Sequence, residues 1–183
     1  MKRAFIILSV LALACSTQQK EGKKASTDEP TTVLKAQLQE ADSLLNSAPF
    51  DELLALREEV DDLYWWFYEE FKDTSDRDFW VYELSDLQRV HKGISNAEKE
   101  PSMLKESIEF SLQQLSDLKL AYESGELDSA SFYTYLMDEQ AATEAVSRRS
   151  LYRSNETQVC LDTWKELRPI LDSTRSYYIS TAE

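Results

Sequence analysis

Apolar side chains recur at steps of three and four residues along most of the chain, the spacing of one face of an α-helix. The first such stripe covers residues 34–45 and ends before Pro49. A second covers residues 53–71, and Asp51 marks its start. Alternation with a period of two is almost absent and the chain has only 3 glycines. The pattern therefore predicts helices rather than strands.

A third stripe covers residues 80–94 and is preceded by polar residues. Ser75 and Asp78 have the spacing of a capping box, which places the N-cap at Ser75. Proline disfavours helical geometry in the residue before it. We therefore expect this third helix to end near residues 98–100, directly before Pro101.

A fourth stripe covers residues 104–122 and is followed by clear end signals. Gly125 is suited to the position after a helix C-terminus, and Asp128 to the N-cap of the next helix. Beyond Asp128 no strong stop follows, although Pro169 should kink any helix that contains it. The remaining chain forms either one long bent helix or two helices with a joint near residues 154–157.

Short connections between consecutive helices imply antiparallel neighbours. We therefore predict an all-α fold for residues 33–183: an up-and-down antiparallel bundle of four to six helices with a long C-terminal helix that Pro169 can kink. The steps of three and four resemble coiled-coil heptads in several segments. No internal repeat of fixed period is apparent.

The first residues have the layout of a secretory signal, in which Lys2 and Arg3 precede an apolar run over residues 4–14. This run is too short to span a bilayer as a helix. Residues 16–32 are polar, without helical spacing, and are predicted to form a flexible tether. The expected organisation is a signal peptide at residues 1–14, a tether at residues 15–32 and the helical domain.

The segment Leu11-Ala12-Leu13-Ala14-Cys15-Ser16 resembles the lipobox of bacterial lipoproteins. This resemblance implies cleavage before Cys15 and attachment to a membrane through lipid on Cys15. Ser16 after the cysteine favours the outer membrane over the inner one. The alternative is ordinary secretion that leaves Cys15 as a free thiol.

The chain has 20 basic and 34 acidic residues, a formal net charge of −14 at pH 7. Loss of Lys2 and Arg3 with the signal peptide would make the mature chain more acidic still. Phosphate backbones and anionic lipids repel such a surface, so nucleic acid is not an expected partner. The charge would attract a basic protein, a peptide or a cation. Plain solubility of exposed helices explains it equally well.

Catalytic and metal-binding patterns are missing from the sequence. The single histidine, His91, shares a stripe with apolar residues and fits a boundary position, and residue 88, three before it, is Gln rather than the Glu of di-iron bundles. Cys160 lies on an apolar stripe and is expected to be a buried hydrophobe rather than a reactive thiol. We predict no catalytic residue, no metal site and no cofactor.

Five successive aromatic residues, at positions 64–68, wrap the circumference of the second helix. Either neighbouring helices enclose them or some form a contact surface. Because Leu63, Phe67 and Phe71 should face the core, we expect Phe67 to be buried and Trp65 to be exposed. The candidate interaction residues are Asp61, Asp62, Tyr64, Trp65, Trp66, Tyr68, Glu69 and Glu70.

These features predict a non-enzymatic, membrane-tethered helical module that binds a protein partner, of basic charge, in the periplasm or at the cell surface. The alternative is a lipoprotein that holds a small cationic or aromatic-stacking ligand near the same aromatic residues. An enclosed apolar pocket there would favour the ligand. A solid core with an exposed aromatic patch would favour the protein partner.

Overall fold

The computed structural model describes residues 28–71 and 77–182, and 93% of them lie in helices. No strand occurs within these two ranges. The helices are α1 (Asp28–Ser47), α2 (Phe50–Ala55), α3 (Arg57–Glu69), α4 (Arg77–Glu123) and α5 (Ser129–Ala182). The all-α class and the long C-terminal helix that the hydrophobic spacing predicts are therefore confirmed.

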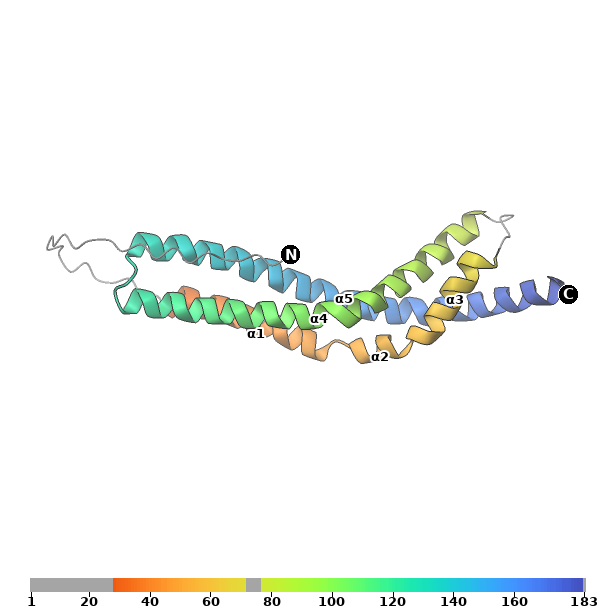
Figure 1. The fold of residues 1–183 in the computed structure, drawn as a ribbon, viewed down its shortest axis with the longest axis horizontal. Coiled ribbons are helices and arrows are strands. Elements are labelled where there is room, and N and C mark those ends of the chain that lie inside the picture. Colours follow the sequence, from red (N-terminus) through yellow and green to blue (C-terminus); the bar gives the residue numbers. More distant parts are fainter. Residues whose placement is uncertain (1–27, 72–76, 183) are drawn as a thin grey trace.

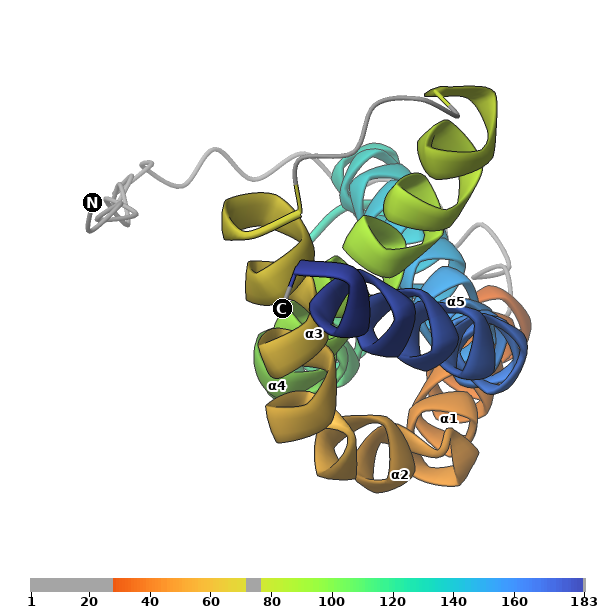
Figure 2. The same ribbon diagram turned by 90° about the vertical axis from the view of Figure 1, so that its right-hand side faces the viewer.

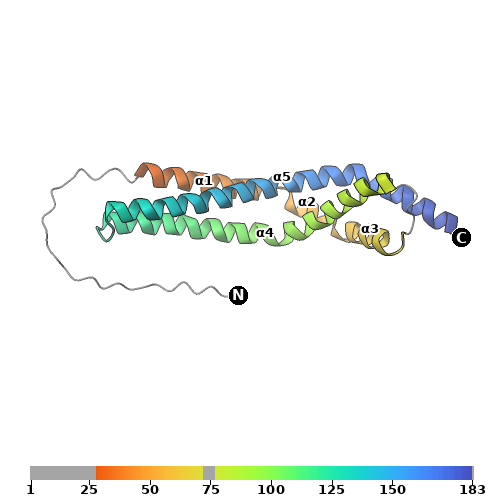
Figure 3. The same ribbon diagram turned by 90° about the horizontal axis from the view of Figure 1, so that it is seen from above.

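The molecule is long and narrow, and its helices form three tracks along the long axis (Figure 1). α1, α2 and α3 follow one another on the first track, α4 runs back along the second, and α5 forms the third (Figure 3). The end-on view shows the tracks arranged around the long axis (Figure 2). α1 begins at the end where α4 meets α5, whereas α3 lies near the opposite end (Figure 1).

Buried side chains follow a seven-residue pattern on each track, with alternating steps of three and four. On α1 they are Thr31, Leu34, Leu38, Ala41 and Leu45. On α4 they are Leu87, Val90, Ile94, Ala97, Leu104, Ile108, Ser111, Leu115, Leu118 and Tyr122. Such steps average 3.5 residues, the spacing at which side chains of neighbouring helices interlock as knobs into holes.

The buried positions of α5 keep this spacing but become polar in the middle of the helix. Between the buried Leu136 and Cys160 the core positions include Thr143, Ser150, Arg153 and Thr157. The Thr157 hydroxyl donates to the carbonyl of Arg153, one turn earlier, at 2.9 Å. This explains why the sequence shows no apolar stripe in this stretch: the core positions are present, but polar residues occupy them.

α4 continues through Pro101, so the predicted helix end at residues 98–100 is wrong. A proline inside a helix cannot donate to the carbonyl four residues earlier, and it kinks the helix. α4 bends near its middle (Figure 1). The seven-residue pattern of buried residues runs on both sides of Pro101, from Leu87 to Tyr122. Packing against α5 along this whole length therefore outweighs the local preference of the proline.

The predicted second helix is divided at Leu56 into α2 and α3. The Leu56 N–H donates to the carbonyl of Leu53, three residues earlier, at 3.2 Å, which tightens the turn. The usual four-residue hydrogen bonding of an α-helix begins again with the Val60 N–H, which donates to the Leu56 carbonyl at 2.9 Å. The chain therefore changes direction here without a loop.

α5 is a single helix through residues 154–157 and through Pro169, which decides between the two predicted alternatives. The predicted end signals before it are confirmed. Gly125 has a φ of +82°, the left-handed conformation that a glycine adopts readily after a helix. The Asp128 carboxylate accepts a hydrogen bond from the Ser131 N–H at 2.8 Å, as an N-cap does.

The predicted signal peptide, Cys15 and the Ser75 N-cap lie outside the described residues. α1 begins at Asp28, so residues 28–32 are helical rather than part of the predicted tether. Among the described helices, none combines the length and apolar content needed to cross a membrane.

Candidate interaction surface on α3

α3 divides its aromatic residues between the core and the solvent. Val60, Leu63 and Phe67 are buried, with Phe67 only 3% exposed. Trp65 is 53% exposed and Tyr68 is 50% exposed. The predicted burial of Phe67 and exposure of Trp65 are both observed, because residues two apart on a helix point about 200° apart.

An inner aromatic cluster joins α3 to the other two tracks. It consists of Trp66, Phe67, Phe71, Trp80 and Tyr178. The Trp66 and Tyr178 ring centroids lie 5.8 Å apart, and those of Phe71 and Trp80 lie 4.5 Å apart. Trp66, a candidate contact residue, is half-buried in this cluster, and the Arg175 guanidinium lies 5.5 Å from its ring. Its position is that of a structural residue at the core boundary.

The remaining candidates, Tyr64, Trp65 and Tyr68, form an outer aromatic surface. The Tyr64 ring stacks on His91 of α4 at 3.9 Å with an interplanar angle of 7°. Trp65 meets Tyr64 edge to face at 5.2 Å, and Tyr68 lies 4.5 Å from Tyr64. Burial, followed by the hydrogen bond with Tyr68, raises the pKa of the Tyr64 phenol.

Two polar contacts link this surface to α4 and α5. His91 Nε2 lies 3.3 Å from Asp61 Oδ1, and this contact agrees with the predicted boundary position of His91. Asp62 pairs with Arg175 of α5 at 2.5 Å. Two of the candidate carboxylates are therefore engaged within the chain. Glu69 and Glu70 are exposed at the C-terminal end of α3 and directly follow Tyr68 along the chain.

His91 and Arg175 belong to this site, but the sequence did not indicate that they meet α3. Their partners are 30 and 113 residues away along the chain. The pairing depends on how α4 and α5 are aligned with α3, which periodicity alone does not determine. The only sequence signal was an isolated histidine beside an apolar stripe.

Cys160 is fully buried and has no disulfide partner among the described residues. Burial raises the pKa of its thiol to about 11, which opposes formation of a reactive thiolate at neutral pH. Within residues 28–71 and 77–182, no group of three or more His, Cys, Asp or Glu side chains is placed to hold a metal ion.

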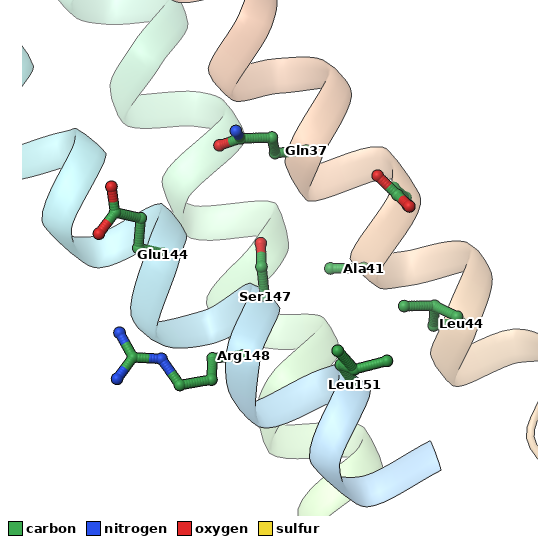
Figure 4. Close-up of a pocket in the computed structure, with 8 residues that line it drawn as sticks. Gln37, Ala41, Leu44, Glu144, Ser147, Arg148 and Leu151 are labelled. Carbon is green, nitrogen blue, oxygen red and sulfur yellow. The ribbon is translucent and has the colours of Figure 1, made fainter. Parts of the chain in front are cut away.

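An open groove of about 410 Å³ lies between α1 and α5, away from the aromatic surface (Figure 4). Its lining residues are Gln37, Glu40, Ala41, Leu44, Glu144, Ser147, Arg148 and Leu151. On each helix they are spaced by three, one and three residues, as expected for a furrow between adjacent helices. The groove is an open furrow rather than the enclosed apolar pocket that typifies a small-molecule site.

Comparison of the chain with protein-family models, curated proteins and solved structures found no match.

Proposed function

We propose that the chain is a lipid-anchored protein of the cell envelope, bound to the outer membrane through Cys15, and that its outer aromatic surface on α3 binds a protein partner. We further interpret the three tracks as an up-and-down antiparallel bundle. Its role in this proposal is non-enzymatic: the helices present the surface at a distance from the anchor.

The observation that carries the proposal is the exposure of Trp65 and Tyr68 on a helix fixed from beneath by the inner aromatic cluster. Tryptophan and tyrosine are over-represented among interface hot spots because they offer a large contact area at a low entropic cost. The stacking of Tyr64 on His91 and the pair between His91 and Asp61 hold the surface in one conformation before binding. Preorganisation of this kind improves affinity.

Charge favours a basic partner. The chain is strongly acidic, and Glu69 and Glu70 lie directly beside the outer aromatic surface. Complementary charge mainly raises the association rate and selects among partners. A salt-dependent association rate is therefore part of the proposal.

A small cationic ligand is the second candidate, because exposed Trp and Tyr rings attract cations through their π faces. The two candidates differ in the area they cover. A protein partner would protect Trp65, Tyr68 and the exposed side of α3 together, whereas a small cation would protect only the rings it touches.

The test is site-specific photocrosslinking of the intact protein in its native envelope. A benzophenone side chain at position 65 should give a discrete protein adduct, whereas one at Phe110, which is also well exposed but lies on α4, should not. Trp65→Ala should remove the same partner from affinity purifications, whereas Phe110→Ala should retain it. Adducts of equal yield at both positions would contradict a specific α3 interface.

A further inference from the structure

A polar groove of about 670 Å³ lies between α4 and α5 and carries an excess of positive charge. Its lining includes four cationic side chains and two carboxylates: Arg89, Lys92, Arg149, Arg153, Glu100 and Glu156. The whole chain has a net charge of −14. The net charge of the groove is therefore opposite in sign to the net charge of the whole chain.

Two arginines of α5 share one carboxylate of α4 in this groove. Arg149 Nη2 lies 2.8 Å from Glu100, and Arg153 donates from Nε and Nη2 to the same carboxylate at 2.5 Å. Burial alone would raise the pKa of Glu100, but hydrogen bonds from Arg153 and Arg149 outweigh it and hold that pKa below its ordinary value. One negative charge thus faces two positive charges, which leaves this triad with a net charge of +1.

Besides the net charge of +1 on the triad, Lys92 adds a second uncompensated positive charge to the groove. Arg89 is offset by Glu156 at 3.2 Å and at longer range by Asp86. Lys92 lines the same groove and has no ion-pair partner among the described residues. Its ammonium carries three donors, so it can bind an anion without first breaking an internal pair.

The arginines of the groove keep free N–H donors, and a neighbouring ring restrains their orientation. A guanidinium has five N–H donors, and Arg149 uses two types of nitrogen, Nε and Nη2, for Glu100. The Tyr152 ring lies 5.6 Å from the Arg149 guanidinium and 5.1 Å from that of Arg153, which restrains both planes. Gln88 and Asn96 add neutral amide donors to the lining.

We propose that the α4/α5 groove binds an oxyanion of the phosphate type, attracted by the positive charge of the groove, with Lys92 and the outer donors of Arg149 as its cationic contacts along the groove. Planar and tetrahedral oxyanions accept several charge-assisted hydrogen bonds at once, which suits guanidinium and ammonium groups on facing helices. This site uses no residue of the α3 surface, so it can be tested independently of the proposed partner interface. The oxyanion belongs either to a soluble phosphate compound or to a phospholipid headgroup.

The test uses the full chain carrying Cys15→Ser, so that no lipid anchor contributes to binding. Inorganic phosphate is titrated by calorimetry at constant ionic strength, with chloride as the reference anion. We expect saturable binding that Lys92→Gln and Arg149→Gln each weaken about tenfold, the usual effect of losing one charge-assisted hydrogen bond. Lys105→Gln should leave it unchanged, because Lys105 is on the same helix but does not line the groove. Thermal unfolding confirms that each variant is folded.

A second arm separates the two sources of the oxyanion by cosedimentation with phosphatidylglycerol or phosphatidylcholine vesicles. Phosphate binding without cosedimentation assigns a soluble ligand. Cosedimentation with phosphatidylglycerol alone, lost in Lys92→Gln, assigns a headgroup. The proposal is overturned if neither form of binding is seen, or if Lys92→Gln and Lys105→Gln weaken binding equally.

Discussion

Trp65 and Phe67 illustrate how two positions on one helix give neighbouring aromatic residues different roles. Phe67 is enclosed by the inner aromatic cluster, whereas half of Trp65 faces solvent. Sequence composition does not distinguish them, but their helical phase relative to Leu63 does. The proposed binding role of Trp65 can therefore be tested separately from the contribution of Phe67 to stability.

Phe67→Ala should cost about 3–5 kcal/mol in the free energy of unfolding, because it leaves a large cavity in the core. Trp65→Ala, which removes a side chain already 53% exposed, should cost about 1 kcal/mol or less. Urea unfolding followed by circular dichroism measures both. Equal losses for the two variants would mean that Trp65 is part of the core and that the interface proposal fails.

The Cys160 thiol should give the folded protein a specific sensitivity to alkali. Its folded pKa is raised to about 11, above the ordinary value of 9.0. The unfolded chain therefore loses this proton first, and the stability that the neutral thiol contributes is present below pH 9 and declines between pH 9 and 11. The loss should be about 3 kcal/mol at most. Unfolding of the wild type and of Cys160→Ala across this range isolates it, because the variant should decline less.

At the scale of the helices, α4 and α5 lie close together where Gly93 faces Cys160. A Cβ added at Gly93 would lie 2.5 Å from the Cys160 sulfur. A side chain at residue 93 therefore has to displace that sulfur or separate the two helices. The sequence did not indicate this close approach, because one glycine inside a helical stripe has several explanations.

Gly93→Ala sets two effects against each other. Alanine favours the helix by about 1 kcal/mol, while overpacking costs about 1–3 kcal/mol. We expect a net destabilisation in the wild-type background. In a Cys160→Ala background the clash is relieved and the same change should stabilise the protein. A double-mutant cycle measures the coupling, and additive effects would contradict the close contact.

The triad of Glu100, Arg149 and Arg153 lies directly before Pro101, where α4 lacks one backbone hydrogen bond. It therefore joins α4 to α5 next to the position where Pro101 removes a backbone hydrogen bond of α4. The Arg153 side chain is only 9% exposed and Glu100 is 21% exposed, so this pair within the triad is better shielded from water than the pair of Arg57 and Glu98. Loss of the triad should therefore lower the free energy of unfolding more than loss of a surface ion pair does.

Glu100→Gln should cost roughly 2–4 kcal/mol, because it leaves two arginines facing each other in a shielded site. Glu98→Gln is the matched control two residues away, since Glu98 pairs with Arg57 in a more exposed position. That change should cost less than about 1 kcal/mol. Thermal or urea unfolding of both variants provides the comparison, and a loss no larger for Glu100→Gln would show that the triad contributes little.

At the scale of the whole molecule, periodicity predicted the all-α class, the loop at Gly125 and the buried faces of α1 and α4. It predicted too early an end at Pro101 because a local rule ignores packing on both sides of the kink. It left the middle of α5 undecided because Thr143, Ser150 and Thr157 occupy core positions with polar side chains. The contacts of α3 with His91 and Arg175 depend on helix alignment, which no local signal encodes.

The anchor is the remaining prediction at this scale. Cys15→Ser should abolish labelling of the protein with radioactive fatty acid and release it into the soluble fraction of lysed cells, because it removes the sulfur that would carry the proposed lipid. Fractionation of the wild type alongside provides the reference. A variant that stays with the membrane would contradict the lipobox interpretation.

The length of the path from α1 to α3 sets how far from a membrane the outer aromatic surface can work. α1 begins at Asp28 and α3 ends at Glu69, so these helices cover 42 residues and span at most about 60 Å at 1.5 Å per residue. If lipid on Cys15 holds the start of α1 near a membrane, as proposed, the outer aromatic surface can reach about 60 Å above it. A partner located at that height would meet the surface at a high local concentration, whereas a partner lying flat on the same membrane would meet it only when the molecule tilts.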